Sequence, residues 1–228
     1  MRWLTPRLSS VSCALMLDSR ANVLLACALS AIAGYVDGIG FLHLGGLFVS
    51  FMSGNSTRMG VSLADGQWWS ALEALGLIML FVAGAAVGSL IVLGRSAQRQ
   101  AMLLLVEALV LVAAALAHHL GQQAVAVSAI VVAMGLENAV FQIDGGGGLG
   151  LTYVTGALVK VGQLLAAALT GGARWGWLPN LLLWAALVAG AVGGALAYAR
   201  FNLGAIWIAA GVALALAVII AAGAKRAD

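Results

Sequence analysis

The sequence predicts an all-α polytopic membrane protein, and three observations support that fold class. Hydrophobic residues make up 63% of the 228 residues and charged residues only 8%, whereas soluble domains carry roughly 25% charged residues. Several apolar stretches approach or exceed the roughly 20 residues that cross a bilayer. The order of apolar and polar stretches in the first half of the chain also recurs in the second half, which indicates an internal duplication.

The duplication is clearest in one motif, which reads LFVSFMSGNSTRMG at 47–60 and LGLTYVTGALVKVG at 149–162. In both copies a hydroxyl–aromatic–apolar–hydroxyl run leads to a glycine, Gly54 or Gly156. A single cation, Arg58 or Lys160, follows four residues later. We therefore expect each repeat to contain one broken or re-entrant element, with the two elements sharing one central site, as in many transporters.

Residues 1–20 are predicted to form a cytoplasmic tail, and residues 21–228 a single membrane domain made of repeat one, 22–119, and repeat two, 123–224. Repeat one is expected to hold a span at 22–42 interrupted at 34–40, the broken element at 47–64, a polar turn at 65–70 and spans at 71–94 and 101–117. Repeat two is expected to hold a span at 123–141, the broken element at 149–169 and spans at 178–199 and 203–222.

Arginine and lysine positions predict the orientation, because cytoplasmic connections are enriched in these residues. The tail, the Arg95–Arg99 connection, Arg174 and the C-terminal end should be cytoplasmic. The Asp65–Gln67 turn, which lacks Arg and Lys, should lie outside. Each half then crosses the membrane a net three times, so the repeats are inverted. Parallel repeats with eight plain spans are the alternative.

The focal motif supplies the candidate solute site. The runs Val49–Ser53 and Leu151–Thr155 are rich in β-branched, aromatic and hydroxyl residues, so we expect extended strands that pair with each other. Helices beginning near Gly54 and Gly156 would aim N-terminal N–H groups at a shared cavity. The alternative is two ordinary helices with cations that reach an interface. The candidate substrate-binding residues are Ser53, Gly54, Asn55, Ser56, Arg58, Thr155, Gly156 and Lys160.

Three acidic residues, Asp37, Glu107 and Glu137, lie inside apolar spans. An acid at the bilayer centre costs about 2.5 kcal/mol or more, so each should face a cavity or a partner. Asp37 and Glu137 are the candidate proton-coupling residues. Alternatively, they neutralise Arg58 and Lys160. Glu107 is expected to have a structural role.

Other function classes find little support. The eleven basic residues form no clustered face, which argues against nucleic-acid binding. The two cysteines, Cys13 and Cys27, make neither a disulfide framework nor a metal site, and Gly145–Gly148 lacks the lysine of a phosphate-binding loop. No nucleophile–base–acid arrangement emerges. We therefore expect no enzyme, cofactor or metal.

The segments Ala33-Gly34-Tyr35-Val36-Asp37 and Ser53-Gly54-Asn55-Ser56, with the later run Thr152–Leu158, resemble the YoaK family of uncharacterised bacterial membrane proteins. The resemblance covers Asn22 to the C-terminus and implies a multi-pass protein of the bacterial inner membrane without an established substrate. Ser53 stands where that family usually has threonine, and Arg58 occupies a position expected to vary. A strand leading into a half-helix is also similar to the core of SulP and uracil-permease transporters.

These patterns favour a small secondary transporter or facilitator for a polar or anionic solute, with proton coupling as a candidate mechanism. The expected partners are the lipid bilayer, the solute and, as a candidate assembly, a second copy in a homodimer. A non-transporting scaffold or partner subunit, and a channel, are the alternatives.

Overall fold

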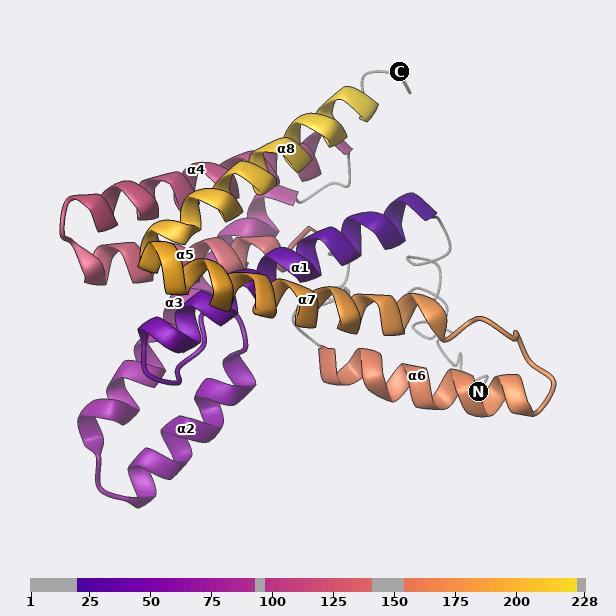
Figure 1. Cartoon of the computed structure of the whole chain (residues 1–228), viewed down its shortest axis with the longest axis horizontal. Coiled ribbons are helices and arrows are strands. Elements are labelled where there is room, and N and C mark those ends of the chain that lie inside the picture. The colour runs from indigo at the N-terminus through magenta and orange to yellow at the C-terminus, as the bar shows by residue number, and fades with distance from the viewer. Residues whose placement is uncertain (1–19, 93–96, 141–153, 225–228) are drawn as a thin grey trace, which may run out of the picture.

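The computed structural model describes residues 20–92, 97–140 and 154–224, which hold eight α-helices, one short 3₁₀-helix and no strand (Figure 1). The first half contains α1 (Arg20–His43), α2 (Met52–Ala64), α3 (Trp68–Val92) and α4 (Ala97–His119). The second half contains α5 (Gln123–Glu137), α6 (Val154–Leu169), α7 (Leu178–Phe201), the 3₁₀-helix η2 (Asn202–Ala205) and α8 (Ile206–Ala224).

Two of the turns between helices depend on glycine. Gly66 follows α2 with φ 71°, and Gly121 follows α4 with φ 77°. This left-handed conformation ends a helix cheaply only where no Cβ is present. Both turns are polar in sequence, as expected for connections that leave the membrane.

The predicted interruption of the first span at 34–40 is wrong, because α1 is helical from Arg20 to His43. Its glycines instead allow close packing on α7. A Cβ at Gly34 would collide with the carbonyl oxygen of Leu187, and one at Gly194 with that of Tyr35. Small residues that let two backbones approach are the usual device of helix pairs in lipid.

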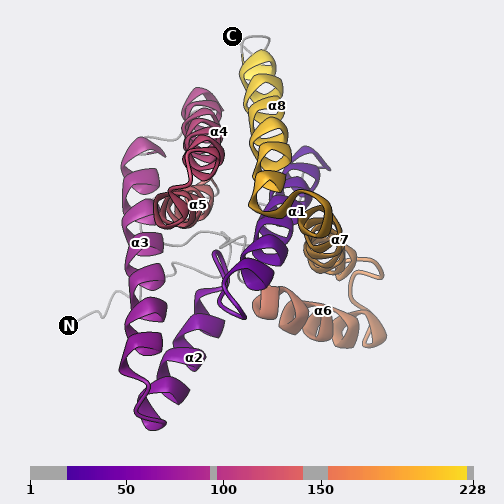
Figure 2. The same ribbon diagram turned by 60° about the vertical axis from the view of Figure 1, so that its left-hand side comes forward.

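A second close pair joins α3 to α5, and Figure 2 shows it beside the α1–α7 pair. A Cβ at Gly84 on α3 would collide with the carbonyl oxygen of Val132, and one at Gly135 on α5 with that of Phe81. Each close pair therefore joins a helix of the first half to a helix of the second half.

The predicted strand at Val49–Ser53 is wrong, although the predicted break in the helix is present. Residues 44–51, which we term the α1–α2 connection, are irregular, and α2 begins at Met52. The chain turns back along α1 before α2 runs outward again (Figure 1). α2 has 13 residues, or about 20 Å at 1.5 Å per residue, which is shorter than the roughly 30 Å hydrocarbon core.

In the second copy of the motif, Val154 and Thr155 are already helical in α6. The predicted extended conformation is therefore wrong for these two residues. The rest of the predicted strand, 151–153, lies outside the described residues, as does the predicted tail up to residue 19.

The helices have the length and surface of membrane spans. Four stretches are long and apolar enough to cross a bilayer: Asn22–His43, Trp68–Val92, Gln98–His119 and Leu178–Ala224, the last comprising α7, η2 and α8. Large hydrophobic side chains such as Met79, Leu90 and Val218 are exposed on the outer surfaces. A soluble protein rarely exposes such extensive apolar surface, so these faces contact lipid. The predicted all-α polytopic membrane fold is confirmed.

Candidate functional site

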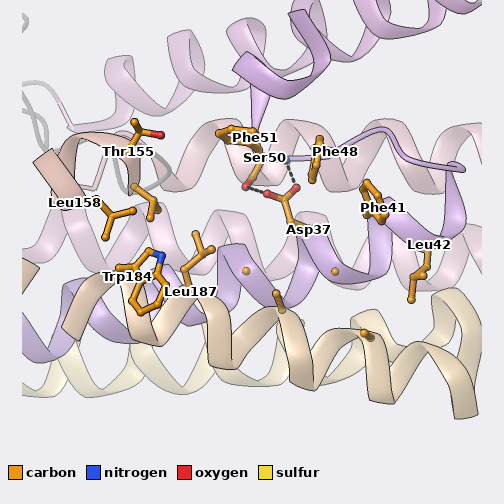
Figure 3. Close-up of a pocket in the computed structure, with 15 residues that line it drawn as sticks. Asp37, Phe41, Leu42, Phe48, Ser50, Phe51, Thr155, Leu158, Trp184 and Leu187 are labelled. Carbon is orange, nitrogen blue, oxygen red and sulfur yellow. Dashed lines mark hydrogen bonds between the residues drawn. The ribbon is translucent and has the colours of Figure 1, made fainter. Parts of the chain in front are cut away.

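A cavity of about 590 Å³ lies between α1, the α1–α2 connection, the first turns of α6 and the middle of α7 (Figure 3). Three polar side chains line it: Asp37 from α1, Ser50 from the connection and Thr155 from α6. The other lining residues are aromatic, aliphatic or glycine. A mostly apolar cavity of a few hundred Å³ with a few converging polar groups is typical of small-molecule sites.

Asp37 binds the α1–α2 connection through three hydrogen bonds. Its Oδ1 accepts the backbone N–H groups of Val49 at 2.8 Å and Ser50 at 2.7 Å. Its Oδ2 accepts the Ser50 hydroxyl at 2.6 Å. Irregular backbone at membrane depth is costly unless its polar groups find partners. Asp37 supplies those partners, which explains why the connection needs no paired strand.

Asn55, the only buried residue of α2, holds the same connection from the other side. Its Oδ1 accepts the backbone N–H of Phe48 at 2.8 Å, and its Nδ2 donates to the carbonyl oxygen of Phe48 at 2.7 Å. Gly54 leaves room for the rings of Phe48 and Phe51, which a Cβ would approach to 2.8 Å and 2.6 Å. Asn55 and Gly54 therefore shape the cavity wall without facing into the cavity.

Aromatic rings form much of the cavity wall. The ring centroids of Phe41 and Phe48 lie 5.1 Å apart, and those of Phe48 and Phe51 lie 5.2 Å apart. Trp184 lines the cavity from α7 (Figure 3). Phe41 and the lining residue Leu158 are each more than two-fifths exposed, so the mouth of the cavity is apolar.

The structure brings Asp37 and Thr155 to one cavity, but it does not bring all the predicted site residues there. Ser53, Ser56 and Arg58 are exposed on α2 and do not line the cavity. The Arg58 guanidinium lies against Gly46, so Asp37 bonds to the connection and not to Arg58. Gly156 and Lys160 are half-buried on α6 and also lie outside the lining.

Glu107 on α4 and Glu137 on α5 are both completely buried, with 0% of each residue exposed. None of their four carboxyl oxygens has a hydrogen-bond partner in the part of the chain that the structure describes. Glu137 interacts electrostatically with Glu107 and with Asp37. Among the described residues, no group of three or more His, Cys, Asp or Glu side chains is placed to hold a metal ion.

The contribution of α7 to the site was not predicted from the sequence. Trp184, Leu187 and Ala191 line the cavity opposite the α1–α2 connection. A tryptophan inside an apolar span was the available signal, since tryptophan favours membrane interfaces. Its proximity to Asp37 depends on which helix packs against α1, and periodicity does not reveal that.

Comparison with known proteins supports the family resemblance and the membrane location. The family described as "Protein of unknown function (DUF1275)" matches residues 25–219. The UPF0700 transmembrane protein RA0705 of Rhizobium meliloti (strain 1021) is 37% identical over 198 residues, which cover 87% of this chain and 85% of that protein. No solved structure matches the chain. The predicted resemblance is confirmed, and the chain belongs to the DUF1275 family of uncharacterised multi-pass membrane proteins.

Proposed function

We propose that this protein is a small secondary transporter or facilitator whose solute binds in the cavity between α1, the α1–α2 connection, α6 and α7. The observation that carries the proposal is the buried carboxylate of Asp37, which lines the cavity while it holds an irregular connection. Ionisable groups inside membrane proteins commonly mark solute or ion pathways. Irregular backbone beside a cavity is a recurring feature of transporters.

Inverted repeats are part of this proposal, and the helix packing supports them. Gly34 and Gly135 are related by an offset of about 101 residues, and each faces a backbone carbonyl of its partner helix, at Leu187 or Phe81. Those two carbonyls are themselves related by an offset of about 106 residues. α4 and α8 pack side by side and run in opposite directions (Figure 1), which favours inverted over parallel repeats.

We also propose an orientation with both termini in the cytoplasm of a bacterial cell and the helices in its inner membrane. The start of α1, the start of α4, the α6–α7 turn and the end of α8 lie on one side of the molecule (Figure 1). The turns after α2 and α4 lie on the other side. Arg99 and Arg174 belong to the first side, which the positive-inside rule assigns to the cytoplasm.

Proton coupling would involve Asp37 and Glu137, as predicted, and Glu107 joins them because its carboxyl group interacts with that of Glu137. Two buried carboxylates without partners cannot both carry charge cheaply in apolar surroundings. A proton is the simplest ligand for such a pair, since none of the four carboxyl oxygens has a hydrogen-bond partner among the described residues. The interaction of Glu137 with Asp37 would link this pair to the cavity.

The proposal is tested by ligand screening followed by uptake into proteoliposomes. A solute at 100 times its dissociation constant should stabilise the purified protein by about 2.7 kcal/mol. Uptake of that solute should saturate and should be lost in Asp37→Asn. Glu73→Gln, at an exposed position on α3, is the matched control and should retain uptake. Folded protein that responds to no solute class and transports none would contradict the proposal.

A role as a non-transporting partner subunit is the second candidate, and the surface of α2 favours it. Ser53, Ser56 and Arg58 are exposed there, although polar groups facing lipid are costly. A second copy in a homodimer or another membrane protein would cover them. Ser56→Cys should then form cross-links within a purified complex, and an absence of cross-links in native membranes would argue against such a partner.

A further inference from the structure

We infer that the solute is an amphipathic organic cation, with an ammonium group on an aromatic or alkyl body. The inference rests on the proposed function only in treating the ligand as a transported solute, because the binding site itself requires no transport. Its basis is the combination of one buried carboxylate, an aromatic wall and an apolar mouth in the cavity of Figure 3.

The charge of the cavity is the first argument. Among the described residues, the hydrogen bonds to Asp37 come from backbone N–H groups and a hydroxyl, all of them neutral. Such donors stabilise a carboxylate, yet they bring no positive charge to it. No Lys, Arg or His is among the described residues that line the cavity. A buried charge without an opposite charge is costly, and a cationic ligand supplies the missing charge.

The aromatic wall is the second argument. Phe41, Phe48 and Phe51 form a contiguous group of rings, and Trp184 lines the cavity from α7. Ring faces attract cations, and clusters of aromatic rings are a recurring site for ammonium groups. The same rings offer apolar surface to the body of the ligand, so both ends of an amphipathic amine are accommodated.

The mouth of the cavity is the third argument. Phe41, Leu42 and Leu158 line the cavity and are more than two-fifths exposed. An apolar mouth admits ligands that partition into the membrane, and it offers nothing to a strongly hydrated ion. Amphipathic cations have this property, whereas ammonium ion and metal cations do not.

An anionic solute, which the helix N-termini predicted, fits this cavity less well. The first turn of α6 contributes a partial positive charge of about half a unit. An ionised Asp37 carries a full negative charge in the same cavity, and the two predicted cations, Arg58 and Lys160, lie outside the lining. The full charge outweighs the partial one.

Two sources could supply the ammonium group: a soluble amine, or a lipid with an ammonium headgroup such as phosphatidylethanolamine. The test uses the full-length protein in detergent free of such lipids and three probes of similar shape: phenethylammonium, phenylpropionate and phenylpropanol. Binding is measured by calorimetry and by thermal stabilisation. In a second arm, the detergent is supplemented with phosphatidylethanolamine or, as its control, phosphatidylglycerol.

We expect phenethylammonium to bind saturably and roughly tenfold or more tightly than the anion or the alcohol, because truncating one partner of a buried charge pair carries a large penalty. Asp37→Asn should remove that preference. Leu158→Trp, which fills the cavity without altering Asp37, should also abolish binding. Leu165→Trp makes the same change at an exposed position on α6 outside the lining and should retain it.

Stabilisation by phosphatidylethanolamine alone, with the same response to Leu158→Trp, would support the lipid as the source. Equal binding of phenylpropionate and phenethylammonium would overturn the inference, as would folded protein that responds to neither the amine nor the aminolipid. An amine that binds but is not moved across proteoliposome membranes would uphold the inference and contradict transport. Uptake of another solute without amine binding would uphold transport and contradict the inference.

Discussion

Ser50 donates its hydroxyl to Asp37 Oδ2 at 2.6 Å, while its backbone N–H donates to Oδ1 of the same carboxylate at 2.7 Å. One residue of the α1–α2 connection therefore binds both oxygens of one carboxylate on α1. This double contact fixes the wall of the cavity and places the carboxylate beside it.

Ser50→Ala should lower the free energy of unfolding by about 2 kcal/mol, because hydrogen bonds to charged groups contribute roughly 1.5–3 kcal/mol. Thermal unfolding of the purified protein in detergent measures the change. Ser56→Ala is the control: Ser56 is exposed and its hydroxyl bonds only within α2, so its effect should stay within about 0.5 kcal/mol. Equal effects of the two substitutions would contradict the assigned role of Ser50.

Asn55→Ala should cost about 3 kcal/mol, since it removes two hydrogen bonds and leaves the N–H and C=O groups of Phe48 without their partner. It should also loosen the connection, so a cysteine placed at Val49 should react faster with a thiol reagent. Thr57→Ala, at an exposed position on the same helix, should change neither property. Unchanged reactivity at Val49 would show that Asn55 does not hold the connection.

Gly194→Ala and Gly162→Ala should change the free energy of unfolding in opposite directions. A Cβ at Gly194 collides with the backbone of Tyr35, so α1 and α7 must separate, at a cost of about 1–3 kcal/mol or more. A Cβ at Gly162 on α6 meets nothing within 4 Å, and alanine should stabilise that helix by about 0.5–1 kcal/mol. Thermal unfolding of both variants measures the two changes in stability. A neutral Gly194→Ala would exclude close α1–α7 packing.

Glu107→Gln and Glu137→Gln should affect stability non-additively, by about 1 kcal/mol or more, because the two buried carboxyl groups interact. Unfolding free energies of the two single variants and the double variant give the coupling. The matched cycle pairs Glu107→Gln with Glu73→Gln, whose side chain is exposed on α3, and it should be additive. Additivity in both cycles would remove the carboxyl pair from any account of proton coupling.

Much of the fold was predictable from composition and patterning, because apolar length alone identifies membrane helices. The motif also predicted correctly that the helix breaks between His43 and Met52. The interruption predicted at Gly34–Gly40 was wrong because glycine carries two signals. Glycine breaks helices in water, but in lipid it also permits close helix contact. Which of these two effects applies depends on a partner helix far away in sequence.

The candidate site was predictable only in part, for a related reason. The sequence predicted that Asp37 belongs near the motif. In the structure, Asp37 accepts hydrogen bonds from the backbone N–H groups of Val49 and Ser50, which belong to that motif. It did not predict that these bonds replace strand pairing, because a side chain twelve or thirteen residues away leaves no periodic signal. The roles of Arg58 and Lys160 as solute ligands stay predictions.

The pairing of α1 with α7 also constrains how the protein is made. Ser30 donates to the carbonyl oxygen of Leu183, 153 residues later in the chain, at 3.1 Å. At roughly 5–20 residues per second, the ribosome needs on the order of ten seconds to supply that partner. During this interval α1 lacks the helix on which its glycine face packs in the complete protein.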